Sequence, residues 1–159
     1  MRILLLLITT LGLHACQKES GFDPTRATSF SVGGYAPMCS GEDKDCFAAF
    51  RLVGDELFED TLSQWPGSWA AVAFDPMPYE PTGVADASSL LADFPESIWH
   101  TPTGNQYCAG CDDGGVLVLE LQIGEETRHW EYPQPVGDAE DELSQFLAAA
   151  LAQLLLFQE

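Results

Sequence analysis

The segment from residue 116 to residue 132 constrains the fold of this 159-residue chain more than any other feature. Residues 116–123 are rich in valine, leucine and isoleucine, and residues 127–132 alternate between two sets of side chains with a period of two. Gly124-Glu125 lies between these runs and can form a two-residue turn. This is the strongest β-hairpin pattern in the chain, and it predicts an antiparallel pair of strands.

The residues after this hairpin predict a long amphipathic helix. Pro133 and Pro135 end the second strand, Asp138 is placed to cap the helix, and the acidic residues 140–142 favour the positive end of a helix dipole. Apolar side chains then recur at intervals of three and four, at Leu143, Phe146, Leu147, Ala150, Leu151 and Leu154. Such a stripe is typical of a helix that covers an apolar face of another element.

A second hairpin is expected nearer the N-terminus. Residues 28–32 suit a strand that ends before a loop beginning at Gly33-Gly34. Residues 47–53 and 56–59 then flank Gly54-Asp55, which has the two-residue spacing of a hairpin turn. The sequence therefore predicts strands on both sides of that turn.

The middle of the chain predicts shorter elements. We expect a strand over residues 68–74, irregular chain over the proline-containing residues 75–81, and a short helix capped by Asp86 that ends at Phe94. Two hairpins and a terminal helix together predict an α+β domain, in which a mainly antiparallel sheet is covered on one face by the C-terminal amphipathic helix.

The N-terminal residues have the pattern of an export signal. Arg2 precedes an apolar run over residues 3–13, and the small residue Ala15 stands directly before Cys16. This pattern resembles the lipobox of bacterial lipoproteins. The resemblance implies cleavage after residue 15, a diacylglycerol on the Cys16 thiol and a further acyl chain such as palmitate on its amine. Each buried methylene contributes about 0.8 kcal/mol, so the anchor would be effectively permanent.

On this interpretation residues 1–15 are a cleaved signal peptide, residues 16–27 a lipidated tether and residues 28–159 a single domain. Gln17 after the cysteine favours the outer membrane of a bacterial cell envelope. Two alternatives stay open: an ordinary cleaved signal that leaves Cys16 as a free thiol, and a transmembrane helix. The second is disfavoured because the apolar run is far shorter than the roughly 20 residues that a span needs.

The charge balance restricts the partners. The chain has 25 acidic and six basic residues, and cleavage would remove only Arg2 from this total, leaving a formal net charge of −20. A field of that sign repels phosphate backbones and anionic lipid headgroups. Composition therefore argues against nucleic-acid binding, and it leaves the lipid on Cys16 to hold the protein at the membrane.

Four further cysteines, Cys39, Cys46, Cys108 and Cys111, predict two disulfide bonds in an oxidising compartment, with three pairings open. The last two also have the spacing of a thiol-disulfide redox motif. However, no helix is expected after them, and the aspartates that follow disfavour the thiolate. Zinc and calcium are weaker alternatives because no spacing matches a known site, and we expect no metal or other cofactor.

No catalytic motif is present. The mature chain has only two histidines, and neither a Gly-x-Ser-x-Gly elbow nor a His-Glu-x-x-His helix occurs. His129 falls in a predicted strand and is expected to be exposed or at a sheet edge. His100, beside Trp99 in a threonine- and proline-rich stretch, is the better functional candidate, although nothing nearby in sequence would orient it.

The tryptophans have two interpretations. Core packing is the first, because indole rings dominate burial in small domains. Alternatively, an aromatic pair projecting from loops could form a binding patch with neighbouring polar residues, suited to a basic or polar partner. The residues of this possible patch are Trp99, His100, Tyr107, Asp112 and Asp113.

A resemblance supports the architecture but adds no catalytic residue. Cysteines before the first hairpin, the run from Cys108 to Gly115 leading into a hairpin with Trp130, and a leucine-rich terminal helix resemble a group of small bacterial lipoproteins and secreted proteins of unknown function. The part from Gly114 onward is also similar, over a shorter stretch, to protease inhibitors of the emfourin type.

We therefore expect a membrane-anchored envelope lipoprotein that acts as a non-catalytic binding or interaction module with a protein partner in the envelope. Two alternatives are a thiol-disulfide redox protein that uses Cys108 and Cys111, and an inhibitor of an envelope protease.

Overall fold

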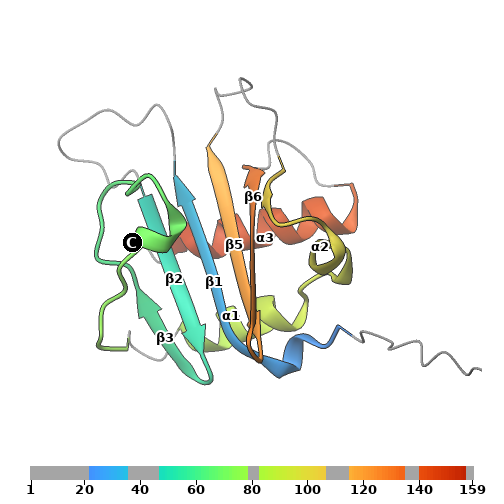
Figure 1. The fold of residues 1–159 in the computed structure, drawn as a ribbon, viewed down its shortest axis with the longest axis horizontal. Helices are drawn as coiled ribbons and strands as arrows, with labels where there is room; N and C mark the ends of the chain where they lie inside the picture. Colours follow the sequence, from blue (N-terminus) through green and yellow to red (C-terminus); the bar gives the residue numbers. More distant parts are fainter. Residues whose placement is uncertain (1–21, 36–46, 79–82, 107–114, 135–139, 157–159) are drawn as a thin grey trace, which may run out of the picture.

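The computed structural model describes residues 22–35, 47–78, 83–106, 115–134 and 140–156 of the chain (Figure 1). These residues form an α+β fold around a six-stranded mixed sheet. Across the sheet the strands are β3 (Glu56–Glu59), β2 (Phe47–Val53), β1 (Ala27–Tyr35), β5 (Val116–Ile123), β6 (Glu126–Pro133) and β4 (Gly104–Asn105). All neighbouring pairs are antiparallel except β4 and β6, which are parallel.

The hairpin of β5 and β6 confirms the strongest prediction from the sequence. Gly124 in its turn has a φ of 62°, a conformation that glycine adopts without steric cost. Leu119 pairs with Trp130, and neither side chain is exposed to solvent. The second predicted hairpin, β2 and β3, is also present, with a φ of 61° at Gly54. Alternation along these strands gives the sheet two different faces.

One face of the sheet packs against the helices α1 (Val84–Ala92), α2 (Glu96–His100) and α3 (Glu142–Leu156), and we call it the helix-covered face (Figure 1). The predicted stripe of α3 lies in this core: Phe146, Leu147, Ala150 and Leu154 are buried. None of the helices in the described ranges combines the length and the hydropathy needed to cross a membrane.

The N-terminus of α3 differs from the prediction. Asp138 lies outside the described residues, and the helix begins at Glu142. Asp141 provides the cap, because its carboxylate accepts the backbone N–H of Ser144 at 2.9 Å and the Ser144 hydroxyl at 2.8 Å. Of the acidic residues expected in the first turn, Glu142 alone lies within the helix.

The other face of the sheet is partly covered by residues 60–78, and we call it the loop-covered face. The strand expected over residues 68–74 is wrong: these residues contain the 3₁₀ helix η2 (Trp69–Ala71), and Phe74 makes only a single bridge with Asp60. The indole of Trp69 lies over Gly33, where a Cβ would be 2.5 Å from its ring. This packing also explains why β1 continues through Gly33, which the sequence placed in a loop.

The helices around residue 95 also differ from expectation. α1 begins at Val84 with Gly83 at its N-cap, so Asp86 lies in the first turn and does not cap the helix. α2 was not expected, because it has only five residues and follows Pro95 directly. His100 is the last residue of α2 and therefore does not lie in a loop.

Described structure is present before residue 28, within the range that the sequence assigned to a tether. The ring of Phe22 stacks on Trp99 with a centroid distance of 5.6 Å and contacts Phe94 at 5.7 Å. The 3₁₀ helix η1 (Pro24–Arg26) follows, and Asp23 caps it by accepting the backbone N–H of Thr25 at 3.0 Å. Residues 22–27 are therefore part of the domain, because aromatic packing holds them.

Candidate functional site

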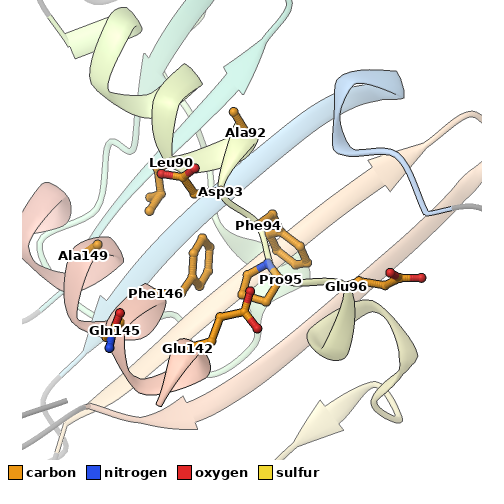
Figure 2. Close-up of a pocket in the computed structure, with 10 residues that line it drawn as sticks. All are labelled: Leu90, Ala92, Asp93, Phe94, Pro95, Glu96, Glu142, Gln145, Phe146 and Ala149. Atoms are coloured by element: carbon orange, nitrogen blue, oxygen red, sulfur yellow. The ribbon is translucent and has the colours of Figure 1, made fainter. Parts of the chain in front are cut away.

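A concave site of about 470 Å³ lies on the outer side of the helical layer, between the connection from α1 to α2 and the first turns of α3. We call it the helix-side groove (Figure 2). It is lined by Leu90, Ala92, Asp93, Phe94, Pro95, Glu96, Glu142, Gln145, Phe146 and Ala149. Its volume falls within the range of about 300–1,000 Å³ that is typical of ligand sites.

The floor of the helix-side groove is apolar and packed against the core. Phe94 is 3% exposed, and its ring packs edge-on against Phe146 at a centroid distance of 5.3 Å. α1 ends at Ala92 with Asp93 as its C-cap, and Pro95 is the N-cap of α2, so that Phe94 lies at the corner between the two helices and enters the core. The ring of Phe94 also contacts Trp130 at 5.8 Å, which ties the floor to the sheet.

The rim of the helix-side groove is acidic. Asp93, Glu96 and Glu142 are exposed and come from three different segments, and no lining residue is basic. Figure 2 shows Glu142 on the α3 side of the groove, and Asp93 and Glu96 on the side of the connection between α1 and α2. The imidazole of His100 lies 3.2 Å from Glu96, one helical turn away. The groove therefore combines an apolar floor with a negative edge.

The possible binding patch predicted from the sequence is only partly placed by the structure. Trp99 is 7% exposed and lies between Phe22 and the guanidinium of Arg128, whose carbon is 4.5 Å from the ring centroid. It therefore does not project from the surface, and the core-packing interpretation is correct for this residue. His100 is exposed near the helix-side groove, whereas the other three members lie outside the described residues.

The loop-covered face carries a row of polar side chains that crosses the sheet. The Arg51 guanidinium donates to the Ser31 hydroxyl at 3.1 Å and to the Glu120 carboxylate at 3.3 Å. Ser31 is fully buried, and the guanidinium also lies 4.1 Å from the ring centroid of Phe74. His129 continues the row, because it is the cross-strand neighbour of Glu120. It is half-buried beside β5 and so less exposed than expected.

A second concave site, of about 310 Å³, lies where residues 65–70 overhang β5 and β6. We call it the sheet pocket, and it is lined by Trp65, Gly67, Ser68, Trp69, Ala70, Glu120, His129 and Glu131. Trp69 is 7% exposed, and its Nε1 is buried without a hydrogen-bond partner among the residues that the structure describes. A buried indole N–H normally has an acceptor, so the environment of the Trp69 N–H is unusual.

Both concave sites were missed by sequence reasoning, because each is assembled from segments that are distant along the chain. The signals that existed were local: Pro95 directly after a phenylalanine for the groove, and the polar residues Glu120 and His129 in the two predicted strands for the pocket. The disulfide prediction for the four cysteines lies outside the described residues. Within those residues, no three histidine, aspartate or glutamate side chains gather as metal ligands would.

Comparison with known proteins gives no match: no family model, no curated protein and no solved structure matches this chain. Functional inference therefore rests on the chemistry of the helix-side groove and the sheet pocket.

Proposed function

We propose that the protein is a lipid-anchored protein of the bacterial cell envelope that binds a protein partner without catalysing a reaction. The observation that carries this proposal is the helix-side groove, in which a buried apolar floor is bordered by exposed carboxylates. A partner segment with apolar side chains on one face and lysine or arginine beside them is complementary to such a surface.

The anchor determines where the domain can act. On the lipobox interpretation Cys16 carries the lipid, and Phe22, the first residue of the described domain, follows six positions later. Six residues span at most about 20 Å when fully extended. Because Phe22 packs on Phe94, which forms part of the groove floor, the groove belongs to the anchored end of the domain. The proposed partner is therefore a protein at the membrane surface.

The groove is tested by NMR titration of the purified domain with a synthetic peptide of alternating leucine and lysine pairs that forms a basic amphipathic helix. We expect saturable shifts in α1, α2 and the start of α3. The charge reversals Asp93→Lys and Glu142→Lys together should weaken binding by about tenfold or more, equivalent to about 1.4 kcal/mol.

The matched control reverses Asp55 and Glu125, which are exposed on the two hairpin turns. This double variant has the same change in net charge, and so the same change in long-range attraction of the peptide. It should bind the peptide within about twofold of the wild type. Equal weakening by both double variants would contradict the groove proposal, since it would mean that the acidic surface as a whole attracts the peptide.

The anchor is tested separately, by the intact mass of protein purified from the envelope. We expect a chain that begins at Cys16 and carries acyl chains, and an unacylated product from Cys16→Ser. An unmodified mature chain in the wild type would instead identify an ordinary secretory signal.

The same mass measurement, after alkylation with and without mild reductant, reads the state of the other cysteines. Two resistant disulfides agree with a structural role. Free or easily reduced Cys108 and Cys111, together with insulin-reductase activity, would replace the binding proposal with the redox alternative. Inhibition in a panel of envelope proteases would favour the inhibitor alternative.

A further inference from the structure

We propose that residues 62–72 act as a lid that opens from the loop-covered face while the rest of the domain stays folded. The lid carries Trp65 and Trp69 and packs on a small apolar cluster. The sheet residues of this cluster are Phe47, Ala49, Val116 and Val118. The lid lies on the opposite side of the sheet from the helix-side groove, so the inference goes beyond the proposed partner binding and does not depend on it.

The two ends of the lid are held by hydrogen bonds. The N–H of Asp60 donates to the Ala49 carbonyl at 3.0 Å, and the N–H of Ala49 donates to the Asp60 carboxylate. The N–H of Thr61 then donates to the Ala73 carbonyl at 3.0 Å. These bonds tie the ends of the lid to each other and to β2, so the base stays in place when the lid moves.

Between these ends, aromatic side chains attach the lid to the sheet. Within the described part of the chain, no hydrogen bond joins residues 62–72 to a strand, and the backbone hydrogen bonds of η2 stay inside the lid. Trp65 stacks on Tyr35 with a centroid distance of 4.4 Å and an interplanar angle of 10°, and Trp69 contacts Phe47 edge-on at 6.5 Å. A segment held in this way has a lower local stability than the hydrogen-bonded strands beneath it.

The indole of Trp69 gives the closed lid a cost that opening removes. The side chain is 7% exposed and lies over Gly33, yet its Nε1 has no partner among the described residues. A donor that is buried without an acceptor has lost its water and gained nothing in exchange. In the open lid this N–H returns to water, which offsets part of the cost of exposing the apolar cluster. The closed state predominates because opening also breaks the ring contacts.

The sheet pocket depends on the position of the lid. Trp65, Gly67 and Trp69 line the pocket from the lid. Glu120 and His129 line it from the strands. The pocket is therefore a feature of the closed state, whereas the open state presents the apolar cluster to solvent. The lid thus gives the loop-covered face two alternative surfaces.

Hydrogen exchange of the indole N–H groups, followed by NMR at constant pH, tests the lid. Trp130 is the internal reference, because its N–H is bonded to the Thr101 carbonyl in the helix-covered core. We expect the N–H of Trp69 to exchange about 100-fold faster or more than that of Trp130. Its rate should also depend less on urea, because opening of the lid exposes less surface than global unfolding.

Two variants separate opening of the lid from global unfolding. Trp65→Ala removes a ring contact of the closed lid and should speed exchange of the Trp69 N–H about tenfold. Phe22→Ala is the matched control, because Phe22 is also half-buried and stacked, on Trp99 in the helix-covered core. Its contacts are the same whether the lid is open or closed. Phe22→Ala should therefore speed exchange of Trp130 and leave that of Trp69 unchanged.

Three results would overturn the inference. Equal exchange rates and urea dependence for Trp69 and Trp130 would mean that the lid opens only when the domain unfolds. Equal acceleration of both indoles by Phe22→Ala would lead to the same conclusion. An unchanged Trp69 rate in Trp65→Ala would mean that water reaches the N–H without movement of the lid.

Discussion

The two faces of the sheet are formed by the same strands but differ in what covers them and in how they pack. On the helix-covered face, side chains of β1, β2, β5 and β6 form one apolar core with the three helices, and Phe30, Leu117 and Trp130 have no solvent exposure. On the loop-covered face the apolar cluster around Trp69 is smaller, and it gives way to the polar row of Arg51 and its partners. A face without a helical layer has room for charged groups, and that is where the sheet pocket lies.

The contrast is clearest in two buried tryptophans. Trp130 on the helix-covered face donates its Nε1–H to the Thr101 carbonyl at 3.1 Å. Trp69 on the loop-covered face is almost as buried, yet its Nε1 has no partner within the described residues. The helix-covered face therefore satisfies the indole N–H of Trp130, as a structural core does, whereas the loop-covered face retains an unsatisfied indole donor among the described residues.

Truncation of an aromatic side chain should have its largest effect on the helix-covered face. Trp130→Ala removes a fully buried ring and should lower the free energy of unfolding by about 3–5 kcal/mol. Trp65→Ala, at a half-buried position on the other face, should cost about 1–2 kcal/mol. Urea denaturation monitored by circular dichroism measures both. Equal losses would mean that the loop-covered face is as much a core as the helix-covered one.

Adjacent glycines in β1 give a second comparison, because they point to opposite faces. A Cβ on Gly33 would lie 2.5 Å from the ring of Trp69, whereas one on Gly34 would lie 2.7 Å from the end of the Leu154 side chain in α3. An indole packed in place cannot rotate away, but a leucine methyl group can. Gly33→Ala should therefore cost about 1–3 kcal/mol and disturb Trp69 fluorescence.

Gly34→Ala is the matched control for this comparison. It should cost less than about 1 kcal/mol, because alanine also reduces the conformational entropy of the unfolded chain. A larger loss from Gly34→Ala than from Gly33→Ala would contradict the fixed position of Trp69 that the sheet pocket requires.

The parts of the fold that local patterns encode could be predicted from the sequence. The hairpin of β5 and β6 has a two-residue turn between strands, and the stripe of α3 has helical periodicity, so each was recognised without knowledge of its surroundings. The strand order could not be predicted, because β1 lies between β2 and β5 and its second partner is about ninety residues away. The parallel pairing of β4 involves only two residues, too few for any pattern.

The elements and sites that the sequence did not predict were missed for one reason. They depend on packing between residues that are distant along the chain. Residues 68–74 have strand-like alternation, but the contact of Trp69 with Gly33 makes η2 the better packed conformation. The same contact extends β1 through a pair of glycines that would otherwise favour a loop. Phe94 and Phe146 are 52 positions apart, and only the tertiary fold makes them the floor of one groove.

A finer test replaces each buried tryptophan with phenylalanine. Trp130→Phe removes the indole N–H and leaves the Thr101 carbonyl unpaired, in addition to the lost volume. Trp69→Phe loses a similar volume but removes a donor that has no partner in the described structure. Trp130→Phe should therefore cost about 1 kcal/mol more than Trp69→Phe in urea denaturation. The reverse order would indicate that the N–H of Trp69 is satisfied in solution.

The smallest expected effect is on the stability of the fold at acid pH, and it comes from the cap of helix α3 and not from the sheet. Accepting the backbone N–H and the hydroxyl of Ser144 holds the pKa of Asp141 below its ordinary value. A carboxyl group with a lowered pKa in the folded state stabilises that state above its unfolded pKa of about 3.9, and the contribution is lost as the pH falls through the folded pKa. Asp141→Asn keeps an acceptor at the cap of α3 but does not titrate there.

The wild type should therefore be more stable than Asp141→Asn at pH 7, and the difference should shrink as the pH falls below about 4. Thermal unfolding of both proteins between pH 7 and pH 2 measures this, with Asp55→Asn on the exposed turn of β2 and β3 as the control. A constant difference across this range would show that Asp141 is not the charged cap of α3.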